Sequence, residues 1–350
     1  MTAPVSIRGF DEVSAVLRGD GWSSDPRHSP LAPPEFAAMP PGAMLFMDPP
    51  DHTRLRRLIA PAFTPKSIEQ LRPRVAAVVS AALSDLPSET DILADFGYLV
   101  PLAVIAELLD VGTEGAALFR AQTPSLVRML EIDAGPEDLA AAAAASLEVT
   151  MFLVPLLTTR RLSPGNDFIS ALLAVDELSL DEVLATCILL LAAGHETTAN
   201  LIADGTLALL DEPSQTEALL ADPALAVEEL IRFTSPVRLA ARVALRDQLV
   251  GDHPIPAGTQ VLLHLDDANH DRHRWPDADI LDLRRPGPPH LGFGGGIHFC
   301  LGAALARLEA AEALPALFAA YPDMQLKGEK IQWRNSSTFH GLEALPIHLG

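Results

Sequence analysis

One cysteine near the C-terminus lies in a sequence context that suits metal binding. Cys300 follows a glycine-rich loop, Phe293 to His298, and precedes Gly302 and a helix-forming run that starts at Ala303. Backbone N–H groups at the start of a helix stabilise a thiolate, and glycines let backbone approach a flat ligand closely. One cysteine is too few for a zinc or iron–sulfur site. A single thiolate as the axial ligand of haem iron accounts for all these features.

The spacing around Cys300 argues against a nucleotide-binding loop and against a purely structural cysteine. A dinucleotide-binding loop needs G-x-G-x-x-G, but Ile297 stands where the third glycine after Gly292 and Gly294 would be. A buried structural cysteine beside an ordinary turn would not need the flanking glycines, phenylalanine and histidine at fixed spacing. The pattern F-G-x-G-x-H-x-C-x-G, from Phe293 to Gly302, resembles the haem-binding signature of the cytochrome P450 family in its bacterial soluble form.

A second polar cluster lies inside the longest predicted helix, which runs from about Ser179 to about Leu210. Ser179 and Glu182 form an S-x-x-E capping box at its start. The middle of the helix reads Gly-His-Glu-Thr-Thr over residues 194–198. Such polar groups in an apolar helix are costly unless they face a cavity or find partners. Thr197 can also bond back to a helix carbonyl and bend the helix.

Haem chemistry would give this cluster a function. Cleaving an O–O bond on iron requires protons, and the Thr197 hydroxyl with the Glu196 carboxylate as relay from solvent suits that task. Gly194 leaves room for a small molecule above the haem. The cluster resembles the family's oxygen-activating acid–alcohol pair. The alternative is a glycine-kinked core helix with ordinary threonine back-bonding. A zinc motif H-E-x-x-H is excluded, because Ala199 stands where the second histidine is needed.

Glu229 and Arg232 lie three residues apart on one predicted helix face. Taken alone, they would form a surface ion pair of roughly 0.2–0.5 kcal/mol. The resemblance instead implies the family's E-x-x-R pair, a buried ion pair that ties this helix to the loop around the thiolate. Its role is structural, in core assembly and haem retention. The family's usual third member is absent at Ile280-Leu281, while Arg284 and Arg285 lie close by.

Haem carries two propionates, which need cationic or hydrogen-bond-donating partners when buried. The segment from Asp48 to Arg57 contains His52 and Arg56 at i, i+4 and resembles the family's D-P-P-x-H-x-x-x-R motif. Arg242 and His298 match the other usual propionate contacts. Each residue alone would be a solvated surface group, so the expectation depends on the four occurring together.

Composition limits the classes of partner. The 350 residues include 25 basic and 46 acidic side chains, a net charge of −21, which argues against nucleic acid and anionic membranes as general partners. Cys187 and Cys300 are the only cysteines, so no disulfide framework is indicated. The uninterrupted apolar runs, such as Cys187 to Ala193, are far shorter than the ~20 residues of a membrane span. A soluble, cytoplasmic protein is expected.

Periodicity predicts a mainly α fold with small β-sheets at one edge. A strand is predicted at Val5–Ile7 and a helix from Asp11 to Leu17. Residues 26–50 hold eight prolines and should form a binding loop or lid. Helical spacing dominates from His52 to Leu210, with breaks at prolines 65, 73, 136 and 164. Short strands such as 261–265 follow Pro236, and helix returns at 302–321.

The resemblance covers about residues 5–349. It implies a single cytochrome P450 domain over 1–350 that lacks the first helix and first strands usual before Val5. It further implies a haem-thiolate monooxygenase with haem b and O₂ as co-substrate. Such an enzyme inserts one oxygen atom into a small organic molecule by hydroxylation or epoxidation, in a role that fits secondary metabolism. Substrate contacts are expected from Pro30–Phe46, Leu189–Ala193 and Val237–Ala241.

Electrons should come from a separate ferredoxin and its reductase, because no flavin or nicotinamide domain is evident in this length. Arg54 and Arg57 are expected to make the face over Cys300 locally basic and to attract an acidic ferredoxin. Two alternatives remain open. The first is a haem-thiolate enzyme that uses peroxide, and the second is a non-catalytic haem-binding protein that recruits a partner.

Overall fold

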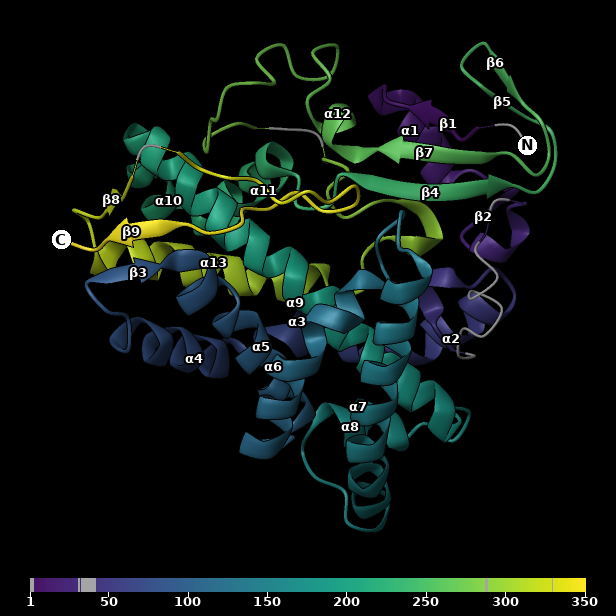
Figure 1. Ribbon diagram of the computed structural model, residues 1–350, viewed down its shortest axis with the longest axis horizontal. Helices are drawn as coiled ribbons and strands as arrows, with labels where there is room; N and C mark the ends of the chain where they lie inside the picture. The colour runs from purple at the N-terminus through teal and green to yellow at the C-terminus, as the bar shows by residue number, and fades with distance from the viewer. Residues whose placement is uncertain (1–2, 31, 33–41, 287–288, 329) are drawn as a thin grey trace.

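Helices make up the body of the molecule, and the small sheets lie in the upper half of the view in Figure 1. The computed structural model describes residues 3–30, 32, 42–286, 289–328 and 330–350. The mainly α architecture expected from the sequence is confirmed. The α-helices are α1 (Phe10–Arg18), α2 (Asp51–Ile59), α3 (Pro65–Glu69), α4 (Arg72–Ser84), α5 (Leu99–Leu109), α6 (Gly112–Arg128), α7 (Pro136–Leu162), α8 (Phe168–Leu173), α9 (Leu180–Asp211), α10 (Thr216–Ala221), α11 (Pro223–Thr234), α12 (Leu265–Asn269) and α13 (Ala303–Ala320).

The strands are short and form three small sheets, in the orders β1-β7-β4-β2, β3-β9-β8 and β5-β6. They are β1 (Val5–Ile7), β2 (Trp22–Ser23), β3 (Glu89–Asp91), β4 (Leu239–Ala244), β5 (Gln248–Val250), β6 (His253–Ile255), β7 (Gln260–His264), β8 (Gln325–Leu326) and β9 (Pro346–His348). In the largest sheet β1 runs parallel to β7, and the other pairings are antiparallel. The strands predicted at 5–7 and 261–265 are therefore confirmed, the second with a shift of one residue.

Helix α9 passes through the middle of the molecule and positions most of the site. The predicted capping box fixes its start: the Ser179 Oγ accepts from the Glu182 N–H at 3.2 Å, and the Ser179 N–H donates to the Glu182 carboxylate at 2.9 Å. Apolar side chains of α9 pack in one large core with those of α4, α5 and α13. A smaller apolar cluster lies between α1 and the four-stranded sheet. Because nearly all sides of α9 are packed, its polar residues must face partners or a cavity.

The prolines predicted to interrupt helices mark their first turns. Pro65, Pro73 and Pro136 each occupy one of the first two positions of a helix, where the missing N–H has no intrahelical acceptor to lose. The proline-rich stretch 26–50 contains no regular α-helix among its described residues, only short 3₁₀ turns at Pro26–His28 and Met44–Phe46. Residues 31 and 33–41, part of the expected binding loop, lie outside the described residues.

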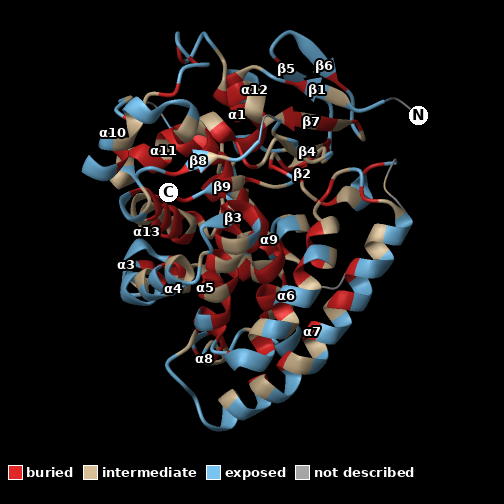
Figure 2. Cartoon of the chain, turned by 60° about the vertical axis from the view of Figure 1, so that its left-hand side comes forward, coloured by how far each residue is buried: buried red, intermediate tan, exposed pale blue. Residues whose placement is uncertain are grey.

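Helix α7 departs from the sequence-based expectation about apolar length. It is the one helix in the described part of the chain that is long and apolar enough, by length and composition, to cross a membrane. It packs along α6, and Figure 2 shows it on the rim with much of its surface exposed. Leu147, Met151 and Val154 expose 60%, 61% and 45% of their surface along one side. Alanines dominate its first half, so no uninterrupted run of large apolar residues marked it in the sequence.

Candidate functional site

A cavity of about 610 Å³ lies between α9, the loop before α13, α2 and β4. It is where most of the predicted site residues come together. The predicted residues that line it are His52, Arg56, Gly194, Thr197, Arg242, Phe293, His298, Cys300 and Gly302. Glu196, Glu229 and Arg232 do not line the cavity, although all three are buried. Motifs from separate parts of the chain therefore contribute residues to one cavity.

The loop before α13 holds the Cys300 thiol at the cavity wall. Gly294 and Gly296 have φ values of +68° and +65°, and a Cβ on Gly296 would lie 2.1 Å from the Leu17 carbonyl oxygen. The Cys300 N–H donates to the Phe293 carbonyl at 2.9 Å. Burial raises the pKa of the Cys300 thiol, whereas the Gly302 N–H and the guanidinium groups of Arg56 and Arg307 lower it.

Gly302 leaves open space next to the sulfur. A Cβ at this position would have one neighbour within 4.0 Å among the described residues, the Cys300 Sγ. A side chain here would enter the cavity beside the thiol. The other cysteine, Cys187, is buried within α9, and burial raises its pKa to about 12, so Cys300 is the one suited to ligate a metal.

Four donor side chains meet at one end of the cavity, and none of them forms an ion pair among the described residues, although the charge of Asp48 acts on His52 and Arg242. The rings of His52 and His298 lie 4.1 Å apart, and neither His52 nitrogen nor the His298 Nε2 has a hydrogen-bond partner among the described residues. Arg242 donates to the Ala241 carbonyl at 2.7 Å and Arg56 to the Phe299 carbonyl at 2.5 Å. Neither guanidinium has a carboxylate partner in the part of the chain that is described.

The electrostatics of this donor cluster call for a negatively charged ligand. Burial, together with Arg242, His52 and Arg56, lowers the pKa of His298 to about 3. Burial lowers the pKa of Arg242 to about 10. The shift of Arg242 reflects poor solvation, and that of His298 reflects poor solvation together with repulsion by its basic neighbours. Two carboxylates of a bound cofactor would satisfy these donors, so the residues present fit haem, whose propionates they would hold and whose iron Cys300 would ligate.

On α9 the structure confirms the geometry predicted for Thr197 and revises that of Gly194. The Thr197 Oγ1 donates to the Ala193 carbonyl at 3.1 Å, and the side chain lines the cavity. Gly194 also lines the cavity, but a Cβ there would lie 3.3 Å from the Ile105 Cδ1. Close packing of α9 against α5 thus favours a small residue here, in addition to any room it leaves for a ligand.

Glu196 is turned away from the cavity. Its carboxylate forms an ion pair with Arg334 and accepts a hydrogen bond from the Tyr98 hydroxyl at 3.4 Å. Arg334 also donates to the Asn200 side chain at 2.8 Å. The side chain of Arg334 is 29% exposed, whereas that of Glu196 is 6% exposed. The predicted relay residue therefore lies between the cavity-lining part of α9 and solvent, held by an arginine that the sequence motifs did not indicate.

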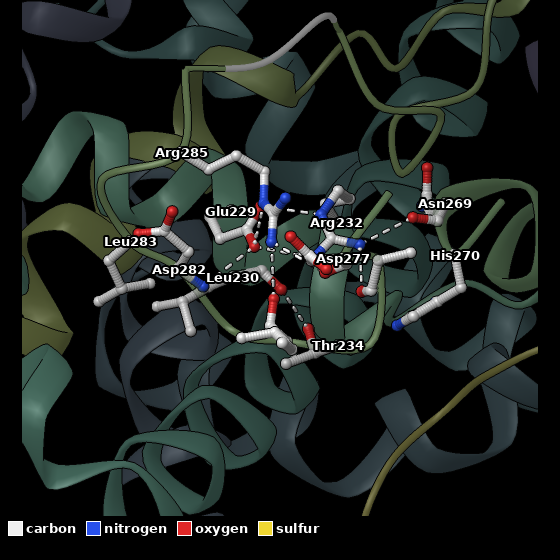
Figure 3. A network of polar contacts seen from close by, with 12 residues as sticks. Glu229, Leu230, Arg232, Thr234, Asn269, His270, Asp277, Asp282, Leu283 and Arg285 are labelled. Atoms are coloured by element: carbon white, nitrogen blue, oxygen red, sulfur yellow. Dashed lines mark hydrogen bonds and ion pairs between the residues drawn. The ribbon is translucent and has the colours of Figure 1, made fainter. Parts of the chain in front are cut away.

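The predicted ion pair on α11 is buried and forms the centre of a larger network (Figure 3). Arg232 contacts Glu229 at 2.8 Å and donates to the carbonyls of Asn269 and Ala278. Arg285 supplies the third member, with its Nε 3.0 Å from Glu229, while Arg284 pairs with Glu217 on the surface.

Asn269 connects this network to the cysteine loop. Its side chain accepts from the Leu291 N–H at 2.7 Å and donates to the Ser235 hydroxyl at 2.9 Å. Leu291 lies directly before the glycine-rich loop. The network thus joins α11 and α12 to the segment that leads to Cys300, as expected for its structural role.

The wall opposite Cys300 is mainly apolar and includes segments that sequence analysis missed. Of the expected substrate contacts, Leu189, Leu190, Val237 and Leu239 line the cavity, as do the described residues 44–46. Residues 129–134, between α6 and α7, line it as well, as do Thr338 and Phe339. No motif marks these loops, because their positions depend on how distant helices pack. The sequence offered one signal for residues 129–135, namely that they form a short connection between two long helices.

The predicted basic face contains two arginines whose charges are compensated. Arg54 forms an ion pair with Glu182, and Arg57 lies 3.0 Å from Glu177. These contacts tie α2 to the start of α9. The expectation that both arginines attract a partner is therefore weakened, because each already has an acidic neighbour.

Comparisons with known proteins match this arrangement. A sequence model described as cytochrome P450 matches residues 224–331. A vitamin D(3) 25-hydroxylase of Pseudonocardia autotrophica is 40% identical over 329 residues, covering 90% of this chain and 80% of that protein. The cytochrome P450 monooxygenase PikC of Streptomyces venezuelae is 40% identical over 357 residues, covering 97% of this chain and 84% of that protein.

Solved structures agree over almost the whole chain. P450BioI in complex with an acyl carrier protein ligated to hexadec-9Z-enoic acid has a TM-score of 0.90 at 33% identity, covering 98% of this chain and 91% of that chain. The tirandamycin C-bound monooxygenase TamI has a TM-score of 0.85 at 37% identity, covering 99% and 89% of the two chains.

Proposed function

Because this chain belongs to the cytochrome P450 family, we propose that Cys300 is the axial ligand of its haem and that the cavity oxidises a large, mainly apolar organic molecule. Family membership makes the protein a haem-thiolate monooxygenase, an oxidoreductase with haem as cofactor and O₂ as co-substrate. The observation that carries the assignment of residues is that the Cys300 thiol and the unpartnered ring nitrogens of His52 and His298 line one cavity.

The residues around Cys300 have distinct proposed roles. Burial raises the pKa of the Cys300 thiol overall, and the Gly302 N–H, Arg56 and Arg307 oppose that rise and so favour the thiolate form. His52, Arg56, Arg242 and His298 would hold the propionates, since the histidines have unpartnered ring nitrogens and the two guanidinium groups, which bond to backbone carbonyls, line the same cavity. Phe293, whose ring lies 4.5 Å from the Arg307 guanidinium, shields the sulfur side. Bound haem supplies the activation of O₂ and the transfer of one oxygen atom.

Proton supply is the proposed role of α9. The Thr197 hydroxyl lines the cavity and can orient a water molecule there, while Glu196 lies one residue away on the side that leads through Arg334 to solvent. Release of the Glu196 carboxylate from Arg334 would let it take up a proton from solvent and pass it toward Thr197.

The proposed reaction is hydroxylation or epoxidation of a natural product in secondary metabolism. The wall opposite Cys300 is built from apolar side chains, including those of Met44, Phe63, Ile105, Leu130, Leu239 and Phe339. Such a wall binds by apolar contact and positions a substrate through a few polar groups. Relatives named for vitamin D(3), 6-deoxyerythronolide B and tirandamycin C support a large organic substrate.

The enzyme takes electrons from a redox partner, and we propose that this partner is a ferredoxin. The surface beside the cysteine loop carries two exposed apolar side chains, Ile297 (49% exposed) and Phe299 (39% exposed). Ile297 lies near Arg57 of α2, whose charge Glu177 compensates. Such an apolar area repels an acidic electron carrier less than the strongly acidic remainder of the surface does. A cytoplasmic location is part of the proposal, supported by two free cysteines.

One observation favours the alternative in which peroxide replaces O₂ and the redox partner. The Glu196 carboxylate is engaged by Arg334 and lies off the cavity, so proton relay requires it to move. Product formation with peroxide at a rate equal to that with ferredoxin, reductase and O₂ would favour this alternative.

The spectrum of the ferrous–CO protein tests the assignment of Cys300. Thiolate ligation gives haem a far more red-shifted Soret band than histidine ligation does. We expect that band in the wild-type protein and its loss in Cys300→Ser, with Cys187→Ser as the matched control that keeps it. A wild-type protein without the band, or its persistence in Cys300→Ser, would overturn the assignment.

A further inference from the structure

We propose that a C-terminal hairpin, residues 333–342, is a positioning element for Glu196 that senses whether residues 129–134 are closed over the cavity. We call residues 129–134 the lid segment. The hairpin is closed by a β-bridge between Trp333 and Leu342 and by a hydrogen bond from the Arg334 N–H to the Gly341 carbonyl at 3.0 Å. The inference rests on the proposed role of Glu196 in proton supply, and it adds that the contact between Arg334 and Glu196 controls this role.

The base of the hairpin holds Glu196. Arg334 forms the ion pair with Glu196 and also donates to the Asn200 Oδ1 at 2.8 Å, one turn further along α9. Gly341 makes this contact possible, since a Cβ there would lie 2.5 Å from the Asn200 Oδ1 and 2.6 Å from an Arg334 nitrogen. The hairpin backbone therefore fits closely against α9, and any shift of the hairpin must move the guanidinium that fixes Glu196.

The middle of the hairpin is fixed to the chain that enters β4. The Arg238 N–H donates to the Thr338 carbonyl at 2.7 Å, and the His340 N–H donates to the Pro236 carbonyl at 3.0 Å. A second β-bridge joins Val237 to Phe339. With these contacts the hairpin is supported in its middle, so a force on its tip is passed to its base instead of being lost in a flexible loop.

The tip of the hairpin holds the lid segment. The buried carboxylate of Glu131 accepts hydrogen bonds from the Ser336 hydroxyl at 2.6 Å and from the Thr338 N–H at 3.1 Å. The Ile132 N–H in turn donates to the Thr338 Oγ1 at 2.7 Å. Glu131 is 5% exposed, and its other charged neighbour is Arg128, 3.5 Å away. Both Glu131 and Thr338 line the cavity.

These contacts link opening of the lid segment to Glu196. A buried carboxylate that loses its donors is strongly destabilised, so opening of the lid segment is costly while the hairpin tip keeps its shape. Opening must either strip Glu131 of its donors or carry Ser336 and Thr338 along with it. In the second case the base of the hairpin relaxes, and Arg334 loosens its hold on Glu196. Closure restores the ion pair.

Reciprocal substitutions test this link. We expect Glu131→Gln to speed amide hydrogen exchange in residues 333–342, and Arg334→Gln to speed exchange in residues 129–134, each by about tenfold, as for the loss of a hydrogen bond to a charged group. The substrate-free, haem-loaded protein is used. Glu137→Gln is the matched control, because it removes the same charge from an exposed residue six positions from Glu131 and should leave both segments unchanged.

A double variant and a rescue separate positioning from general loosening. Glu131→Gln combined with Arg334→Gln should exchange no faster than the more affected single variant, because both act on one element. Arg334→Lys should restore protection of the lid segment. The rate at which imidazole binds the haem iron, measured by stopped flow, should rise in both single variants. The rise should be in the same proportion as the increase in the rate of amide hydrogen exchange. Additive effects, or effects confined to the substituted segment, would overturn the proposal.

A milder pair of variants keeps the test decisive if Glu131→Gln does not fold. Ser336→Ala removes one donor to Glu131, whereas the control Ser84→Ala removes an exposed hydroxyl that bonds to the Ala81 carbonyl at the end of α4. Only Ser336→Ala should speed exchange around Arg334, and equal effects of the two would contradict the link. The exchange results do not depend on Cys300, so failure of the haem-thiolate assignment and failure of this inference are distinguishable.

Discussion

At the scale of single residues, the Thr197 hydroxyl is the part of the proposed proton supply that is simplest to test by substitution. The hydroxyl bonds to the Ala193 carbonyl and faces the cavity, so it can hold a water molecule without leaving its rotamer. Thr206 makes the same type of bond on the same helix, to the Ile202 carbonyl at 2.7 Å, but it does not line the cavity. The two threonines therefore separate an effect on proton supply from an effect on the helix.

We predict that Thr197→Ala keeps haem and substrate binding but forms roughly tenfold less product per reductant, as is typical for loss of a positioned proton donor. Reductant would instead be consumed to make peroxide or water. The measurement is the ratio of product to reductant consumed, with a substrate found by optical titration. Thr206→Ala should keep the wild-type ratio. An unchanged ratio in Thr197→Ala would remove this residue from the mechanism.

Glu309 on α13 makes the stability of the protein depend on pH. Burial raises the pKa of its carboxyl to about 8 from an ordinary value of 4.5. The folded protein therefore keeps a proton that the unfolded chain loses above about pH 4.5. Stability from this group falls as pH rises from about 4.5 to about 8, and does not change further above that range.

We predict that Glu309→Gln removes this dependence. The melting temperature of the wild type should fall between pH 5 and pH 8 by a few degrees more than that of the variant, on the scale of about 1.4 kcal/mol for each unit of pKa difference. Thermal unfolding of both proteins across this range gives the comparison. Parallel curves would show that Glu309 is ionised or solvated in the folded state.

At the scale of elements, the network around Glu229 shows which connections a motif can and cannot predict. Residues i and i+3 of a helix lie on one face, so the sequence was sufficient to predict the pair of Glu229 and Arg232. The choice between Arg284 and Arg285 was not available from sequence, because both lie in an irregular segment after α12 whose path depends on the fold. Arg285 contacts Glu229 and also donates to the carbonyls of Asp277 and Ile280.

We predict that Arg285→Gln lowers the free energy of unfolding by about 3 kcal/mol and reduces haem retention, because it leaves the buried Glu229 with one guanidinium. Arg284→Gln, one residue away, should cost less than about 1 kcal/mol, since its ion pair with Glu217 is exposed. Denaturant unfolding and haem content measure both. Equal destabilisation by the two variants would show that the surface pair, too, supports the fold.

The same distinction applies to the rest of the fold and site. The ends of α9, α13, β1 and β7 were predicted within one or two residues, because caps, prolines and alternation act locally. The cavity residues were predicted because the resemblance linked distant motifs. Arg334, Glu131 and Thr338 were missed, because their roles come from contacts between loops far apart in the chain. The outward turn of Glu196 was missed for the same reason.

At the scale of the whole molecule, the net charge of −21 contrasts with the surface beside the cysteine loop. Ile297 and Phe299 are exposed there, and α2 contributes arginines. A strongly acidic protein repels an acidic ferredoxin over most of its surface, so a locally apolar area beside arginines with compensated charges can select the docking orientation. The position of this area beside Cys300 would keep the path for electrons short.

We predict that Ile297→Glu slows reduction of the haem by ferredoxin about tenfold while leaving reduction by dithionite unchanged. Leu147→Glu adds the same charge to an exposed apolar position on α7 and should not slow ferredoxin. Stopped-flow reduction under CO gives both rates. Equal slowing by the two variants would mean that net charge, and not the docking area, limits the reaction.

The contacts of the hairpin determine how this chain can be recombined with its relatives. Segment exchange between homologous enzymes is a common route to new substrate preference, and the C-terminal loop is an obvious part to exchange because it reaches the cavity. Here the loop makes matched contacts with Glu131 and Asn200, and these require Gly341 within the loop itself. A hybrid should therefore take residues 129–134, the middle of α9 and residues 333–342 from one parent, as a single inherited unit.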